Sequence, residues 1–191
     1  MVVHYRSLIM DSARWDGFEF RPSDIVISTP PKSGTTWTQM LCAMLIFDGP
    51  NFPAPLSELT PWLDQSIRPL DNVRAIYAAQ KHRRFIKTHT PLDGLSLGED
   101  VTYVVVGRDP RDVMISMEHH LANMDLDRVL ALRGQAVGNG DLDSLPSRPL
   151  AVVTRRVIDT TDGWFASESG VVAVMIVEVQ EQVERVDPLR L

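Results

Sequence analysis

Residues 24–39 read Asp24-Ile-Val-Ile-Ser-Thr-Pro-Pro-Lys-Ser-Gly-Thr-Thr-Trp-Thr-Gln39. The apolar run from Ile25 to Ile27 predicts a strand, and the residues after Gly34 predict a helix. The turn between them brings a lysine and several hydroxyl groups to the first turn of that helix. Its backbone N–H groups have no intrahelical acceptor and carry partial positive charge. This strand–turn–helix is therefore expected to bind a phosphate.

The turn differs from the standard phosphate loop, Gly-x-x-x-x-Gly-Lys-Ser/Thr, in which the lysine follows the last glycine. Here Lys32 comes two residues before Gly34, and Pro30 and Pro31 open the turn. The prolines favour an extended exit from the strand, and Gly34 lets the main chain approach an oxyanion closely. A nucleotide kinase that uses ATP and magnesium is thus the less favoured interpretation. An ordinary turn that happens to carry these donors is a further alternative.

Length and composition indicate a single globular domain of 191 residues. We expect no transmembrane helix and no secretory signal, and hence a cytoplasmic protein. The single cysteine, Cys42, agrees with a reducing compartment and is expected to pack on the inner face of the first helix. The net charge of −6 argues against a nucleic-acid partner.

Strands and helices are expected to alternate, which predicts an α/β, P-loop-like three-layer fold with a central parallel sheet flanked by helices. We expect the first helix over 35–47, with apolar residues at a helical period. Asp109 and Pro110 predict an N-cap and first helical position, and Ser57 predicts another cap. The other elements expected are strands at 84–87, 101–107 and 171–179 and helices at 57–64, 71–80, 110–123, 125–133 and 150–165. The apolar residues of the first helix are Met40, Leu41, Met44, Leu45 and Phe47.

Basic side chains follow three of these strands. Lys32 follows the first strand, Lys87 and His89 end the second, and Arg108 ends the third. The carboxyl ends of parallel strands meet at one edge of a sheet, where ligands of open α/β folds bind. We therefore expect these groups to share one cleft. Alternation along the second strand places Lys87 and His89 on the same face.

The loop Pro31-Lys-Ser-Gly-Thr-Thr-Trp37 resembles the 5′-phosphosulfate loop of the cytosolic-type sulfotransferases. These enzymes use PAPS (3′-phosphoadenosine 5′-phosphosulfate) and release PAP. The resemblance implies that Trp37 lies against the adenine, although packing of the first helical turn would also explain this tryptophan. It further implies that the 5′-phosphosulfate is held by Lys32, Ser33, Gly34, Thr35 and Thr36.

A second segment, Phe85-Ile-Lys-Thr-His-Thr-Pro91, resembles the family's Lys-Thr/Ser-His-x-Pro segment. The resemblance implies that His89 is the catalytic base. An acceptor hydroxyl needs a base of near-neutral pKa to take its proton, which suits histidine. Lys87 and Lys32 could stabilise the charge that grows on the sulfuryl oxygens. The resemblance implies no required metal. The alternative for His89 is a hydrogen-bonded structural histidine.

A third segment, Tyr103-Val-Val-Val-Gly-Arg-Asp-Pro-Arg-Asp-Val-Met-Ile-Ser116, resembles the family's 3′-phosphate site. The resemblance implies that Arg108 and Ser116 bind this phosphate, through a forked guanidinium and a hydroxyl donor. Recognition of the 3′-phosphate distinguishes PAPS from ATP. The alternative for Arg108 is a salt bridge to a helix residue.

The resemblance extends from Trp15 to about Trp164 and stops there. We expect a sulfotransferase-like domain over 1–168 and a truncated or divergent tail over 169–191, which adds a strand to the same domain. No Arg-Lys-Gly of the kind that closes the family's 3′-phosphate site occurs in the chain. The predicted activity is sulfuryl transfer from PAPS to a hydroxyl or amine of a small-molecule acceptor. A non-catalytic remnant that binds PAP is the alternative, and the oligomeric state, including a homo-oligomer, is left open.

Other residues give weaker signals. His119 and His120 are adjacent on a helix and face different directions, so we expect them to line a surface or a pocket and not to bind a metal. Trp62 and Trp164 are expected in the core or an interface.

Overall fold

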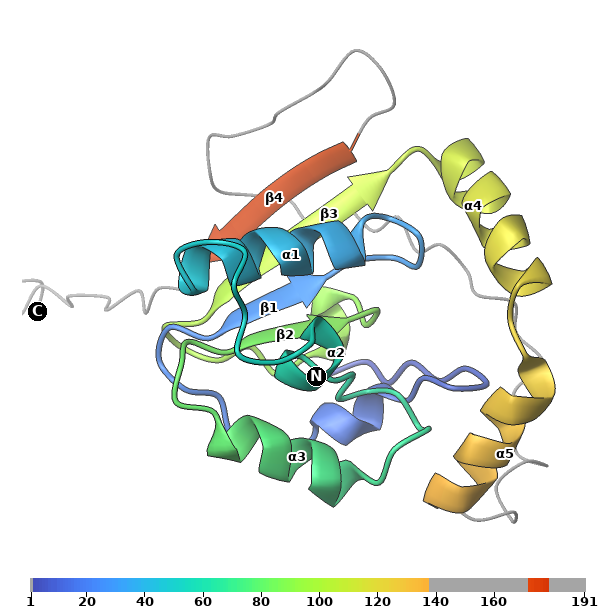
Figure 1. Cartoon of the computed structure of the whole chain (residues 1–191), viewed down its shortest axis with the longest axis horizontal. Coiled ribbons are helices and arrows are strands. Elements are labelled where there is room, and N and C mark those ends of the chain that lie inside the picture. The colour runs from blue at the N-terminus through green and yellow to red at the C-terminus, as the bar shows by residue number, and fades with distance from the viewer. Residues whose placement is uncertain (1, 138–171, 179–191) are drawn as a thin grey trace, which may run out of the picture.

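A four-stranded sheet forms the centre of the fold in the computed structural model, which describes residues 2–137 and 172–178. The strand order is β2-β1-β3-β4 (Figure 1). β1 pairs in parallel with β2 and β3, whereas β4 runs antiparallel to β3. The strands are β1 (Ile25–Ser28), β2 (Phe85–Thr88), β3 (Thr102–Arg108) and β4 (Val172–Glu178).

The α/β fold with a parallel sheet is therefore confirmed for the first three strands, and β4 adds an antiparallel edge. The helix expected over 150–165 and the proposed division of the chain at residue 168 lie outside the described residues. That division stays a prediction.

Five α-helices connect or follow the strands in the described ranges, with short 3₁₀ turns at Ser12–Trp15 and Leu92–Gly94. Asp109 caps α4 by accepting from the Arg111 N–H, and Pro110 opens that helix, as expected. Ser57 does not cap α2, because Pro55 already has a φ of −57° and Ser57 lies inside the helix. The helices are α1 (Thr35–Ile46), α2 (Leu56–Leu59), α3 (Leu70–Ala79), α4 (Pro110–Ala122) and α5 (Leu126–Val137).

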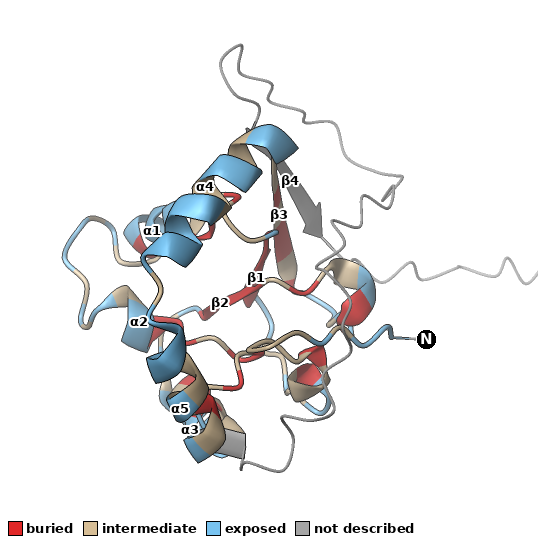
Figure 2. Cartoon of the chain, turned by 90° about the vertical axis from the view of Figure 1, so that its right-hand side faces the viewer, coloured by how far each residue is buried: buried red, intermediate tan, exposed pale blue. Residues whose placement is uncertain are grey.

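Both faces of the parallel strands are buried, as their β-branched sequences predict. Ile25 and Ile27 of β1 face a cluster that includes residues of α1 and α2. Val26 faces the opposite side, where it packs with Trp15 and with Tyr77 of α3. In contrast, α4 buries none of its residues and stands at the side of the sheet (Figure 2).

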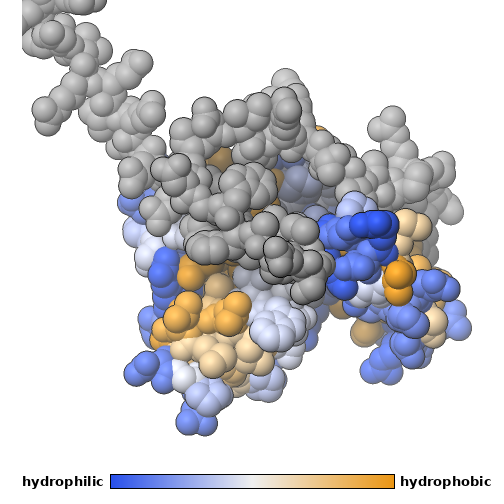
Figure 3. All heavy atoms as spheres, turned by 90° about the horizontal axis from the view of Figure 1, so that it is seen from above, coloured by the Kyte–Doolittle hydropathy of each residue, from blue (hydrophilic) through white to orange (hydrophobic). Residues whose placement is uncertain are grey.

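The apolar residues of α1 do not mark its buried face. Leu45 is 85% exposed and Leu41 is 52% exposed, and the apolar side chains gather on the face seen in Figure 3. The buried residues of α1 include Gln39, Cys42 and Ala43, so that polar and small side chains lie on its buried face. Cys42 therefore packs inward as expected, and burial raises the pKa of its thiol. The helical period thus predicted the helix correctly but not its orientation. Within the described residues, none of the helices is both long and apolar enough to cross a membrane.

A buried ion pair joins the starts of β1 and β2. The Arg84 guanidinium lies against the Asp24 carboxylate, and Arg84 Nε donates to Asp24 Oδ1 at 2.8 Å. The side chains of both residues are less than 5% exposed. Arg84 also donates to the Glu19 carbonyl at 2.9 Å. The pair fixes the segment before β1 to the strand that precedes the predicted base.

Removal of one partner from this pair leaves the other as a buried, uncompensated charge. We therefore expect Arg84→Ala to lower the free energy of unfolding by about 3–5 kcal/mol in urea titrations. The control is Arg111→Ala, which breaks the exposed pair with Asp109 and should change the free energy of unfolding far less, because water screens that pair. Equal effects of the two substitutions would contradict a stabilising role for the buried pair.

Candidate functional site

The turn between β1 and α1 has the backbone geometry of an anion-binding loop. Lys32 has a φ of 62° and Gly34 a φ of 98°, both in the left-handed region that disfavours most side chains. Gly34 is the N-cap of α1, and it provides no side-chain cap. The first N–H groups of the helix therefore have no intrahelical or capping acceptor, and they remain available to an anion.

The hydroxyl groups of this loop differ in their availability. Ser33 is 1% exposed, and its Oγ finds no hydrogen-bond partner in the described parts of the chain. A buried hydroxyl without a partner costs free energy, and a phosphate or sulfate oxygen would satisfy it. The Thr35 hydroxyl is already shared with Thr29, 2.5 Å away. Thr35 would therefore bind an anion through its backbone N–H. The side chain of Thr36 is exposed.

Arg108, at the end of β3, reaches the same loop. Its guanidinium donates to the Lys32 carbonyl at 3.1 Å. The alternative salt bridge to a helix residue also forms, since Arg108 Nε lies 3.8 Å from Asp112 Oδ2. Both side chains are about one-third or more exposed, so this pair is weak. Arg108 could therefore exchange Asp112 for a phosphate. Ser116 lies further along α4 and is half-buried.

His89 is hydrogen-bonded to the main chain just after β1, at the start of the turn that leads to α1. Its Nδ1 lies 2.7 Å from the carbonyl oxygen of Thr29. A carbonyl only accepts, so Nδ1 carries the hydrogen, and in the neutral ring Nε2 keeps its lone pair. Burial lowers the pKa of His89, as do Lys87 and His120, while the Thr29 hydrogen bond and Asp64 oppose this decrease. The imidazole is therefore neutral at pH 7 and can accept a proton.

Lys87 and His89 contact the same indole ring, which agrees with their predicted common face. Lys87 Nζ lies 4.7 Å from the centroid of the Trp62 ring, and the rings of Trp62 and His89 are 4.5 Å apart. Burial lowers the pKa of Lys87 to about 8, and the charge of Arg68 acts in the same direction. The ammonium group is thus still charged at pH 7.

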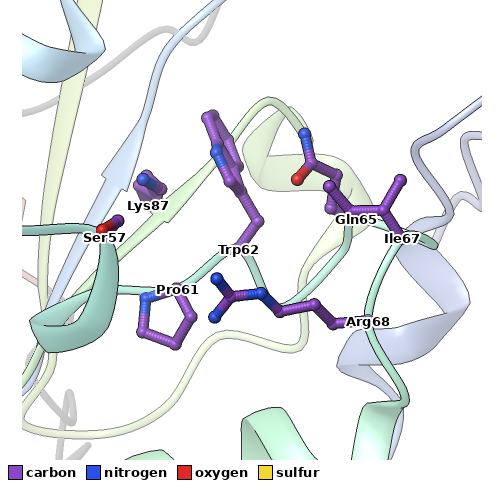
Figure 4. Close-up of a pocket in the computed structure, with 7 residues that line it drawn as sticks. All are labelled: Ser57, Pro61, Trp62, Gln65, Ile67, Arg68 and Lys87. Atoms are coloured by element: carbon purple, nitrogen blue, oxygen red, sulfur yellow. The ribbon is translucent and has the colours of Figure 1, made fainter. Parts of the chain in front are cut away.

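A pocket opens beside this pair (Figure 4). Arg68 and Lys87 supply its cationic groups, and Trp62 supplies an aromatic face. The lining residues are Ser57, Pro61, Trp62, Gln65, Ile67, Arg68 and Lys87.

Sequence reasoning missed three members of this site. Trp62 was expected in the core or an interface, but it lines the pocket and contacts His89. Asp64 and the Thr29 carbonyl were not singled out, although both interact with His89. No motif or spacing marks these residues, because their roles arise from tertiary contacts. No cluster of three or more metal-binding side chains occurs among the residues that the structure describes.

Trp37 lies on the first turn of α1 and is 75% exposed. Packing within the domain therefore does not account for this tryptophan in the described structure. Its indole is accessible to a planar ligand held at the loop.

Comparison with known proteins identifies relatives of this chain. Residues 22–157 match the family described as Sulfotransferase domain. The glycolipid sulfotransferase of Mycobacterium tuberculosis is 57% identical over 135 residues, which are 71% of this chain and 41% of that protein. Sulfotransferase 1A1 of Canis lupus familiaris is 34% identical over 108 residues, 53% of this chain and 37% of the relative. The chain thus spans about two fifths of the length of these curated relatives.

Among solved structures, a complex of retinol dehydratase with retinol and PAP aligns with a TM-score of 0.47 and 24% sequence identity. The alignment covers 65% of this chain and 49% of that protein.

Gly34 provides a test of the loop, because its φ of 98° strains any residue with a Cβ. Gly34→Ala should lower the free energy of unfolding by about 1–2 kcal/mol and should weaken the binding of PAP measured by calorimetry. Gly17→Ala is the matched control, since Gly17 also has a positive φ, 68°, and open space around it. It should cost similar stability and leave PAP affinity unchanged. Equal PAP affinity of the two variants would contradict the assignment of the loop.

Proposed function

The chain belongs to the sulfotransferase domain family, and from this premise we propose that it transfers a sulfuryl group from PAPS to a hydroxyl of a small acceptor. The observation that carries the proposal is the hydrogen bond between His89 Nδ1 and the Thr29 carbonyl. It ties a neutral base with a free Nε2 to the residue just before the phosphate loop. A base in this position can reach an acceptor that approaches a group bound at that loop.

The chain's own residues fit the parts of PAPS. Lys32, the N–H groups at the start of α1 and the orphaned Ser33 hydroxyl would hold the 5′-phosphosulfate. Trp37 offers an exposed indole to the adenine. Arg108 and Ser116 would bind the 3′-phosphate. Bound PAPS supplies the sulfuryl group, whose S–O bond to the 5′-phosphate breaks as the acceptor oxygen forms a new S–O bond.

His89 acts on the acceptor. Its Nε2 takes the proton of the attacking hydroxyl, and the ring becomes an imidazolium that still donates from Nδ1 to Thr29. Lys87 and Lys32 stabilise the negative charge on the transferred group and on the leaving phosphate. Lys87 contacts Trp62 and lies mainly buried, so its charge is weakly screened by water.

The acceptor that we propose is a sugar hydroxyl of a glycolipid. Support comes from the mycobacterial relative, which is named a glycolipid sulfotransferase. The pocket beside His89 agrees with a sugar, because Trp62 provides a face for the ring carbons while Gln65 and Arg68 provide donors for hydroxyl groups.

A second candidate is a domain that binds PAP or PAPS without transfer. It is favoured by the fact that the chain spans about two fifths of the length of its relatives. A kinase that uses ATP is disfavoured, because Lys32 precedes Gly34 and Arg108 reaches the loop.

Calorimetry and a transfer assay distinguish these candidates. PAP should bind and raise the melting temperature, whereas ATP with magnesium should do neither. His89→Ala should keep PAP affinity and lose transfer to a glycolipid, and Lys32→Ala should weaken both. Wild-type protein that binds PAP but sulfates no acceptor of a glycolipid, sterol and phenol panel would support the non-catalytic domain.

The pH dependence of kcat follows from two pKa changes. His89 must be neutral, and burial lowers its pKa, so kcat should rise with pH through a value below 6.5. Lys87 must be charged, so kcat should fall above about pH 8 as Lys87 loses its proton. Lys87→Arg keeps the charge and should remove the alkaline decline, whatever its effect on the maximum rate. A decline near pH 8 that persists in this variant would exclude Lys87 as its source.

A further inference from the structure

Asp64 is a fully buried carboxylate next to the proposed base. It follows α2 and Trp62 in the segment that covers the end of β2. Its Oδ2 accepts hydrogen bonds from the hydroxyls of Thr88 and Thr90, the latter at 2.9 Å. These two threonines are the chain neighbours of His89. A single oxygen atom therefore binds the residues on both sides of the base.

This arrangement fixes the turn that carries His89. The Thr90 N–H donates to the Thr88 hydroxyl at 2.8 Å, which closes the turn on itself. The ring is held separately by its hydrogen bond to Thr29. A general base must lie within about 3 Å of the proton that it takes, so both the backbone and the ring need to be positioned. Asp64 positions the backbone of the turn that carries His89, and Thr29 positions the imidazole ring.

Asp64 also favours the positively charged form of His89, against the other groups around the ring. Lys87 on β2 and His120 on α4 disfavour a positive charge on the imidazole, and burial does so most strongly. Asp64 is the carboxylate that opposes them among the described residues. Its own pKa is raised by burial, while the two threonine hydrogen bonds and His89 oppose this increase. Arg14 also lies within electrostatic range of Asp64.

We propose that Asp64 is a positioning residue for His89, which holds the turn through Thr88 and Thr90 and offsets the imidazolium charge that forms during transfer. This inference rests on the proposed role of His89 as the base. It assigns to Asp64 no contact with the donor or the acceptor.

Asp64→Asn separates charge from shape, because asparagine keeps an oxygen that the two threonines can contact. The His89 pKa, followed by NMR titration of the ring protons and assigned with His89→Gln, should fall relative to wild type. The acid limb of the pH profile of kcat should move to lower pH together with the His89 pKa. The maximum kcat should fall roughly tenfold or more, as expected from lost charge stabilisation. PAP affinity should stay the same.

Two further variants control this experiment. Asp93→Asn makes the same change at an exposed carboxylate four residues after His89, and it should alter neither the His89 pKa nor kcat. Thr90→Val keeps the carboxylate but removes one hydrogen bond that lowers the Asp64 pKa. It should lower the His89 pKa by less than Asp64→Asn does. If Asp64→Asn fails to fold, this variant decides whether Asp64 influences the His89 pKa.

An unchanged His89 pKa and an unmoved acid limb in Asp64→Asn would overturn the inference, even if kcat fell. An unchanged His89 pKa in Thr90→Val would do so if Asp64→Asn does not fold. If wild-type protein transfers no sulfuryl group, the proposed function fails, but the NMR titrations still test the coupling of Asp64 to His89.

Discussion

The parallel pairing of β1 with two neighbours is the constraint on which the site depends. The register aligns Ser28 of β1 with Thr88 of β2 and with Val105 of β3. Each strand therefore ends near the same edge, where the chain leaves the sheet toward Lys32, His89 or Arg108. The hydrogen bonds from His89 to Thr29 and from Arg108 to Lys32 join these exits directly. A different strand order would separate these groups, for which we propose a joint role.

The two ends of the parallel strands differ in whether their buried polar and charged groups are paired. At the amino end, Asp24 and Arg84 satisfy each other and bury their charges as a pair. At the carboxyl end, Lys87 is buried against an indole, and the Ser33 hydroxyl has no partner within the described residues. Lys32 adds a strained φ to the same region. Unsatisfied groups and strain of this kind reduce stability and are common where a ligand completes the structure. The paired end supplies stability that the proposed ligand-binding end lacks.

The orientation of α1 follows from its attachment to the loop. Gly34 fixes where the helix begins, and the helix then turns Gln39, Cys42 and Ala43 toward the sheet. Leu41 and Leu45 consequently point away from the sheet, and Trp37 is left accessible at the first turn. Ile46, at the end of the helix, still packs against the core. The same attachment leaves the first N–H groups of the helix without a side-chain cap next to Lys32 and Ser33.

The sequence by itself determined the strands, the turn between β1 and α1, and the three basic strand ends. These features depend on local periodicity and on residues within a few positions of one another. Only the tertiary structure decided the buried face of α1, the antiparallel direction of β4 and the membership of Trp62 and Asp64 in the site. Asp64 meets its threonine partners across 24 and 26 residues, and His89 meets Thr29 across 60. Such contacts depend on how a loop folds over a sheet, and one sequence contains no spacing rule that specifies this path.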